Sequence, residues 1–425
     1  MPILEVVHSS ACGGLVHRRG AGLDGTFSPF HRQGPGFLLL VALLLLFSGL
    51  AQATSFMAAP RVGVLTMGPG EAFWERFGHD AIVIDSPGQA GPISYNFGYF
   101  DLDEPGFVGR FAKGEMRYML VALPLEQDLA YYREVGRSAR VQWLNLAPAQ
   151  ANALAAALAE NAKPEHAHYR YDYFTSNCTT RVRDALDRAL GGTLHKQLEG
   201  RSSGDSWRSE SLRLASPAAW MWLTFDVLLG PAADRPLTRW EVDFIPRRLA
   251  DDLRNVIGND GRPLVAAEVE LLPQRQAAEP ADHAIALWPW LLAGVLLAGL
   301  VRAVGNRRPR SLAAAALLFW LLCGLVGAVL ALAWLGTAHQ AIWANRNLLL
   351  FNPLCLLLLP GAWAVLRGRA APRPFRRLLV AVCVLAAFTC LPLWLQVLPQ
   401  RNGHWIALLL PLHYALAKVW TTRNP

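Results

Sequence analysis

Hydrophobic positions are spread unevenly along this chain of 425 residues. Residues 54–283 mix apolar positions with charges, turns and prolines, as a water-soluble domain does, whereas residues 284–425 consist of long apolar runs that short arginine-rich loops interrupt. Five runs have about the length that crosses a bilayer, at roughly 285–304, 311–335, 347–366, 378–398 and 404–420. We therefore expect a soluble domain followed by an all-α transmembrane domain of about five helices, the last short enough to be re-entrant.

The charges of the connecting loops predict how these spans are oriented. The loops at 306–310 and 367–377 are strongly basic, whereas those at 336–346 and 399–403 carry one arginine each. Strongly basic loops stay in the cytoplasm. Alternation along the chain then places the soluble domain at 54–283 and the two weakly charged loops on the outer side of the membrane.

The first 53 residues have the layout of a secretory signal peptide. The apolar run "GFLLLVALLLLFSGLAQA" follows a basic stretch and ends in a small-x-small site at Ala51–Ala53. We expect cleavage near Ala53, with an uncleaved anchor helix as the alternative. Either of them exports the segment that follows, in agreement with the loop charges.

The formal net charge of +8 changes this picture little. Much of the excess lies in the N-terminal basic stretch and in the cytoplasmic loops, where membrane topology explains it better than nucleic acid binding. No nucleic acid partner is therefore expected. The exported domain has neither a cysteine pair nor an HExxH motif, so we expect no metal and no cofactor.

Two segments of the exported domain have the pattern of strands, and a third has the pattern of a capped helix. "GHDAIVIDS" alternates from His79 onward, and "ISYNFGYF" follows after the turn "SPGQAGP". In "FTSNCTTRVRDAL", Asn177 precedes a helix with an apolar stripe. We expect a strand pair at 79–84 and 93–100 to pack on the helix that begins at Cys178.

Cys178 is the only cysteine of the exported domain, since the five others lie before the cleavage site or within apolar runs. An unpaired thiol in an oxidising compartment marks a candidate reactive group, although a buried, inert cysteine is the competing interpretation. The start of a helix favours reactivity, because the helix dipole and its free N–H groups lower the pKa of a thiol there. The same N–H groups can hold an oxyanion.

A nucleophilic thiol also needs a base, and His79 is the candidate. The four other histidines of the exported domain lie in a polar loop, after a helix-ending glycine pair, or at the membrane boundary. A histidine at the start of a central strand and a cysteine at the start of a helix have the geometry of papain-like Cys–His enzymes. From spacing alone, a hydrogen-bonded core histidine is an equally good interpretation.

The segments around these two residues resemble one known family. "FGHDAIVI", "YNFGYFD", "KGEMRYML" and "YRYDYFTSNCTTRVRDAL" look like the Lnb N-terminal periplasmic domain family and run in its order across roughly residues 60–260. That domain is similar to the circularly permuted NlpC-type branch of the papain-like fold, which lecithin–retinol acyltransferase shares. "TAHQAIWANRNLLLFNPL" resembles the segment after the second span of full-length Lnb proteins. The resemblance implies an α+β papain-like exported domain on a multi-pass protein of the bacterial inner membrane.

Carried over residue by residue, the resemblance implies Cys178 as the nucleophile and His79 as the base. Asn96 lies on the strand after His79 and is our choice for the group that orients the imidazole. Asp101 is its rival and Asp80 a weaker one. An asparagine that merely suits a turn or an edge strand would explain Asn96 about as well as a catalytic role.

Further polar residues are candidates for the site or for substrate contact. Asn177 can cap the helix, donate to an oxyanion, or do both. Arg181 lies one turn into the helix, where it can meet a lipid phosphate, although a solvated charge is the simpler interpretation. His339, Asn345 and Asn347 lie at the outer face of the spans, where we expect substrate or headgroup contact beyond interfacial anchoring.

The implied activity is that of a lipoprotein N-acyltransferase. An acyl chain would pass from a membrane phospholipid, through a thioester on Cys178, to the N-terminal amine of a diacylglyceryl-cysteine lipoprotein. Two alternatives stay open: a membrane-tethered cysteine peptidase or amidase acting on cell-wall peptides, and a non-catalytic receptor or assembly factor. Five spans favour the acyltransferase, because a wall hydrolase needs only one anchor. The oligomeric state stays unassigned.

Overall fold

The computed structural model describes residues 58–422 apart from residue 283 and residues 392–399. The expected signal peptide at 1–53 and the end of the expected span at 378–398 lie outside the described residues.

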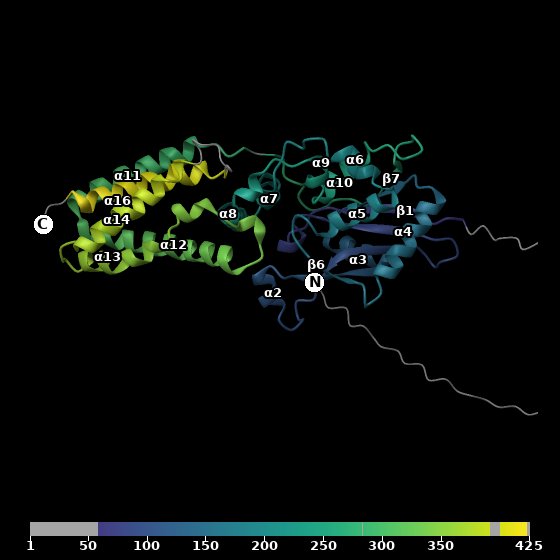
Figure 1. Cartoon of the computed structure of the whole chain (residues 1–425), viewed down its shortest axis with the longest axis horizontal. Helices are drawn as coiled ribbons and strands as arrows, with labels where there is room; N and C mark the ends of the chain where they lie inside the picture. Colours follow the sequence, from purple (N-terminus) through teal and green to yellow (C-terminus); the bar gives the residue numbers. More distant parts are fainter. Residues whose placement is uncertain (1–57, 283, 392–399, 423–425) are drawn as a thin grey trace, which may run out of the picture. The chain divides into compact units, whose positions relative to one another are not determined.

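A seven-stranded antiparallel sheet organises the N-terminal part of the described chain (Figure 1). Its strands are β1 (Arg61–Met67), β2 (His79–Asp85), β3 (Ile93–Tyr99), β4 (Arg117–Pro124), β5 (Ala139–Leu144), β6 (His168–Arg170) and β7 (Val265–Leu272). They lie in the order β6-β4-β3-β2-β1-β5-β7, and each neighbouring pair is antiparallel. The strands β2 and β3 are thus internal, and Ala81 pairs with Asn96 across them.

Nine helices of this part of the described chain lie between the strands in the sequence, and several of them pack on the sheet. They are α2 (Phe107–Lys113), α3 (Leu125–Val135), α4 (Pro148–Asn161), α5 (Cys178–Ala189), α6 (Thr193–Leu198), α7 (Trp207–Ala215), α8 (Ala219–Leu228), α9 (Arg239–Val242) and α10 (Pro246–Leu253), with 3-10 turns η1 (Phe73–Glu75) and η2 (Pro231–Asp234). The helix α5 packs on β2 and β3, and α4 packs beside α5 (Figure 1). The predicted strand pair on the helix that begins at Cys178 is confirmed.

The strand β2 is buried on both faces because alternate positions pack in different clusters. Ala81 lies in one cluster with Leu129 of α3. Ile82 lies in the opposite cluster with Leu186 of α5. Side chains of a strand alternate between faces, so this internal strand receives helix α3 on one side and helix α5 on the other.

The C-terminal part of the described chain is helical. It contains α11 (Trp288–Arg307), α12 (Pro309–Gly336), η3 (Gln340–Ile342), η4 (Arg346–Leu349), η5 (Pro353–Leu358), α13 (Leu359–Leu366), α14 (Arg373–Ala387) and α16 (Gly403–Thr421). Helices α11 and α14 pack along α16, and α12 packs on α13 and η5 (Figure 1).

Three stretches of the described chain are long and apolar enough to cross a membrane: Trp288–Arg307, Pro309–Gly336 and Arg346–Leu366. They overlap the first three expected spans. The fourth expected span is helical up to Ala387 in α14, and the fifth coincides with α16. Five membrane-spanning helices therefore stay a prediction.

The expected span at 347–366 is not one continuous α-helix. Asn352 and Pro353 interrupt it: Asn352 Oδ1 accepts a backbone N–H at 3.0 Å, and the proline lacks the N–H that a longer helix would use. The irregular backbone lies close against α12, where a Cβ on Gly327 would approach the Phe351 carbonyl oxygen to 2.1 Å. Non-helical backbone at membrane depth is tolerated where other protein segments cover it.

We expect Gly327→Ala to destabilise the helical part, because the added methyl group would collide with backbone that cannot rotate away. Overpacking of this kind costs roughly 1–3 kcal/mol. The measurement is the midpoint of thermal unfolding of the purified protein in detergent. Gly299→Ala in α11 is the matched control, since a Cβ there meets nothing within 4 Å. Equal midpoints for the two variants would contradict the close approach.

Candidate active site

Asn177 fixes the start of helix α5 and thereby the place of Cys178. Its Oδ1 accepts the N–H of Thr180 at 2.9 Å, and the Thr180 hydroxyl accepts the N–H of Asn177 at 2.8 Å. Its Nδ2 donates to the carbonyls of Tyr173 at 3.0 Å and Phe244 at 2.8 Å. Both hydrogens of the amide are thus occupied, so the geometry supports the cap and leaves no side-chain donor for an oxyanion.

Cys178, His79 and Asn96 come together from α5, β2 and β3. The thiol of Cys178 and the ring of His79 interact closely enough to shift the pKa of each other. The opposite ring nitrogen, Nε2, lies 3.0 Å from Asn96 Oδ1, which can only accept. The nitrogen left to face the thiol is therefore Nδ1.

The charges of the pair shift both of its pKa values. Burial by itself would raise the pKa of the Cys178 thiol, but the charge of His79 and the hydrogen bond between them outweigh burial and hold it below its usual range. Burial by itself would lower the pKa of His79, yet the charge and hydrogen bond of Cys178 raise it overall. Each group thus favours the charged form of the other, which is the thiolate–imidazolium form.

Neither Asp101 nor Asp80, the two alternatives to Asn96, hydrogen-bonds to the imidazole of His79 in the described structure. Asp101 is exposed, and its Oδ1 accepts the backbone N–H of Asp103 at 2.9 Å within a turn. Asp80 is fully buried, and burial raises the pKa of its carboxyl to about 6. The backbone of Asp80 helps to lower the pKa of the Cys178 thiol.

The strand β3 changes its register beside the thiol. The pairing of β3 with β4 shifts between Phe97 and Tyr99, and Gly98 between them has a φ of +94°. A Cβ on Gly98 would lie 3.6 Å from the Cβ of Cys178. A side chain at this position would thus have a strained backbone and would cover the nucleophile from one side.

Arg181 and His339 lie on an aromatic cluster near the site. The guanidinium of Arg181 stacks over the ring of Tyr169 at 4.2 Å, and its Nε donates to the Ser176 hydroxyl at 3.2 Å. The ring of His339 stacks on Tyr173 at 6.0 Å. Its Nε2 also lies 3.0 Å from a carbonyl of α2. Substrate contact by these two residues stays a prediction.

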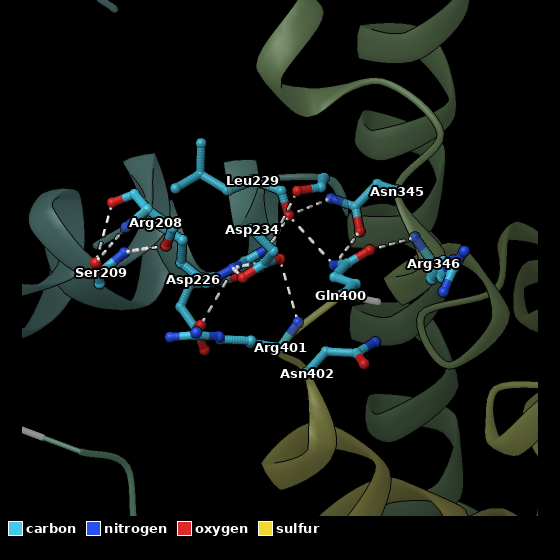
Figure 2. Close-up of polar contacts among 12 residues, drawn as sticks. Arg208, Ser209, Asp226, Leu229, Asp234, Asn345, Arg346, Gln400, Arg401 and Asn402 are labelled. Carbon is cyan, nitrogen blue, oxygen red and sulfur yellow. Dashed lines mark hydrogen bonds and ion pairs between the residues drawn. The ribbon is translucent and has the colours of Figure 1, made fainter. Parts of the chain in front are cut away.

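The structure gives Asn345 and Asn347 other partners than a substrate, and Figure 2 shows Asn345 among its polar contacts. The Nδ2 of Asn345 donates to two carbonyls at the end of α8, both at 2.8 Å, and that of Asn347 donates to one of them at 3.0 Å. Their exposed fractions are 2% and 0%. The buried amides therefore attach α8 to the loop before the third span, and the geometry does not support the expected substrate contact.

A buried charged cluster also joins α8 to α16, and sequence reasoning missed it. Figure 2 shows its residues Arg208, Asp226 and Asp234. Asp226 accepts the indole N–H of Trp405 at 2.7 Å and contacts Nε2 of His404 at 2.5 Å. Arg208 contacts both Asp226 and Asp234. Asp226 of α8 and His404 of α16 are 178 positions apart in the sequence. No local sequence pattern therefore links them.

One group of three carboxylates in the described part of the chain lies close enough together to share a cation: Asp205, Glu210 and Asp282. Arg248 contacts Asp205 at 3.1 Å and Glu210 at 2.5 Å, and Arg213 contacts Glu210 at 2.5 Å. These arginines already supply the positive charge that the carboxylates need.

Two family models match the chain. Residues 52–213 match the Lnb N-terminal periplasmic domain, and residues 284–424 match the Lnb transmembrane domain. The first match contains Cys178, His79 and Asn96, and the second contains the helices from α11 onward. No curated protein and no solved structure matches the chain. The two matches describe a membrane protein with an exported N-terminal domain.

We expect Asn177→Ala to lower the stability of the protein by roughly 1–3 kcal/mol, because it removes the helix cap and leaves two buried carbonyls without donors. Thermal unfolding measures the loss. Asn161→Ala is the control, since that amide is exposed and holds a single carbonyl. Wild-type stability combined with lost activity would instead support the oxyanion role.

We expect His79→Ala to slow the alkylation of Cys178 at neutral pH about tenfold, because the thiol loses the charge and the hydrogen bond that lower its pKa. Iodoacetamide labelling, followed at the Cys178 peptide by mass spectrometry, gives the rate at each pH. His166→Ala, at an exposed histidine of a loop, is the control. Equal rates in wild type and His79→Ala would show that the histidine does not activate the thiol.

Proposed function

Because the chain belongs to the Lnb family, whose paired domains indicate a lipoprotein-processing membrane enzyme, we propose that it is a phospholipid-dependent lipoprotein N-acyltransferase. The observation that carries the proposal is the Cys178–His79–Asn96 arrangement in the exported domain of a membrane protein. Cys178 is the nucleophile, His79 the acid and base, and Asn96 the residue that orients His79.

In the first half of the proposed reaction, the Cys178 thiolate attacks an ester carbonyl of a phospholipid. The new C–S bond forms, the C–O bond breaks, and the protonated His79 gives its Nδ1 proton to the departing oxygen. A lysophospholipid leaves, and the acyl chain stays on the enzyme as a thioester. The N-terminal N–H groups of α5 face the region where the negative charge develops.

In the second half, the N-terminal amine of a diacylglyceryl-cysteine lipoprotein attacks the thioester. The neutral His79 takes a proton from the amine, an amide bond forms, and the C–S bond breaks. Thiolate and imidazolium are then restored. The energy of the thioester drives amide formation, so this sequence of steps uses neither a nucleotide nor a metal.

The membrane part suits this pair of substrates. A phospholipid and a diacylated lipoprotein are both anchored in the outer leaflet, and buried hydrogen bonds attach α8 to the membrane part. We infer that residues 54–283 form a papain-like domain of the permuted NlpC type in the periplasm. Residues 284–425 would then be a five-helix domain in the bacterial inner membrane.

The test is mass spectrometry of lipoprotein N-termini in cells that lack their own N-acyltransferase. Wild-type protein should yield N-acylated termini, whereas Cys178→Ala and His79→Ala should yield none, because each removes a group that the thioester step needs. Cys383→Ala, at a cysteine of α14 far from helix α5 in sequence, is the control and should acylate like wild type.

Unmodified termini in cells that express and insert the wild-type protein would overturn the acyltransferase proposal and favour the peptidase or amidase. Full acylation by Cys178→Ala would overturn the thioester route. In that case Cys178 would serve the packing of α5.

A further inference from the structure

We propose that Asp128 is a positioning residue, which acts through Asn96 to fix the orientation and the protonated nitrogen of His79. Asp128 does not touch the thiol or a reacting atom. The inference rests on the roles proposed above for Cys178 and His79. It concerns the residue that keeps the His79 ring in the orientation and tautomer that these roles need.

Asp128 reaches the site from the face of the sheet opposite to α5. It lies in the first turn of α3, and its exposed fraction is 9%. One oxygen, Oδ2, accepts Asn96 Nδ2 at 2.9 Å and the Ser94 hydroxyl at 2.7 Å. Both partners are donors, as an ionised carboxylate requires.

This single acceptor removes two ambiguities in turn. A carboxylate cannot donate, so the amide atom of Asn96 that faces Asp128 must be Nδ2, and the amide oxygen must face His79. That oxygen cannot donate either, so Nε2 of His79 must carry a hydrogen. The neutral ring then has its lone pair on Nδ1, toward the thiol of Cys178.

The negative charge of Asp128 also acts on the ring once the ring is protonated. Burial lowers the pKa of His79, but the charge of Cys178, their hydrogen bond and the charge of Asp128 together raise it. Further titratable groups that interact with the Cys178–His79 pair are Asp80, Tyr132, Tyr169 and Tyr171. The guanidinium of Arg137 stacks over the ring of Tyr132. Tyr132 is neutral, because burial raises its pKa well above the usual range.

A purely structural role for Asp128 would consist of tying α3 to β3. Such a role predicts lower stability on substitution but an unchanged titration of Cys178 in the protein that stays folded. The positioning role predicts that the titration itself moves. The pH profile of thiol reactivity therefore separates the two.

The experiment is the rate of iodoacetamide alkylation at the Cys178 peptide against pH, in full-length protein in detergent. Asp128→Asn keeps the size and an acceptor but removes the charge and the unique amide orientation. The midpoint of its profile should rise by about one pH unit. Glu126→Gln, at an exposed carboxylate of the same helix, should leave the midpoint unchanged.

A midpoint equal to that of wild type in folded Asp128→Asn overturns the proposal. If that variant does not fold, Asn96→Ala carries the test, since it cuts the same chain of hydrogen bonds. An unchanged midpoint in folded Asn96→Ala overturns the proposal equally. The alkylation needs no acyl transfer, so a shifted profile in a protein that never acylates lipoproteins would retain this inference and reject the proposed function.

Discussion

The interaction between one half-buried thiol and one half-buried imidazole, those of Cys178 and His79, is the one on which the arrangement of this exported domain depends. Burial opposes charge on both groups, so the ion pair exists only where further partners stabilise each charge. The backbone of Asp80 favours the thiolate, and the sulfur lies at the N-terminus of α5, where the helix dipole also favours negative charge. The imidazole donates its Nε2–H to the side-chain oxygen of Asn96. Each charge is thus stabilised from its own side.

The register of the sheet supplies these partners. Because Ala81 pairs with Asn96, the amide lies on the same face as His79, two residues earlier on β2. A slip of one residue would turn Asn96 toward α5 and away from Asp128 on α3. Two helices on opposite faces of one strand pair therefore contribute to one site, α5 with the thiol and α3 with the carboxylate.

Local signals were enough to predict part of this site, and tertiary packing decides the rest. The cap at Asn177 and the strand that begins at His79 can be read from neighbouring residues, and the structure places Cys178, His79 and Asn96 near one another, while their catalytic roles stay a prediction. Asp128 is one acid among several on an exposed-looking helix, and only the packing of α3 on β3 reveals its role. The interruption of the third span at Asn352 can be predicted from Pro353, which follows it. The close approach of the Phe351 carbonyl to Gly327 of α12 cannot be predicted from the sequence, because it depends on how the two segments pack.

The junction between α8 and the membrane part is held by polar contacts, and this has a mechanical consequence. Arg208, Asp226 and His404 are all at most 2% exposed, and removing one partner of a buried ion pair typically costs about 3–5 kcal/mol. Apolar surfaces can slide over each other, whereas directed bonds such as those of Asn345 fix one geometry. In the acyl transfer proposed above, two lipid-anchored substrates would reach the same sulfur in succession, and the directed contacts of α8 with the membrane part would help to keep Cys178 accessible to both.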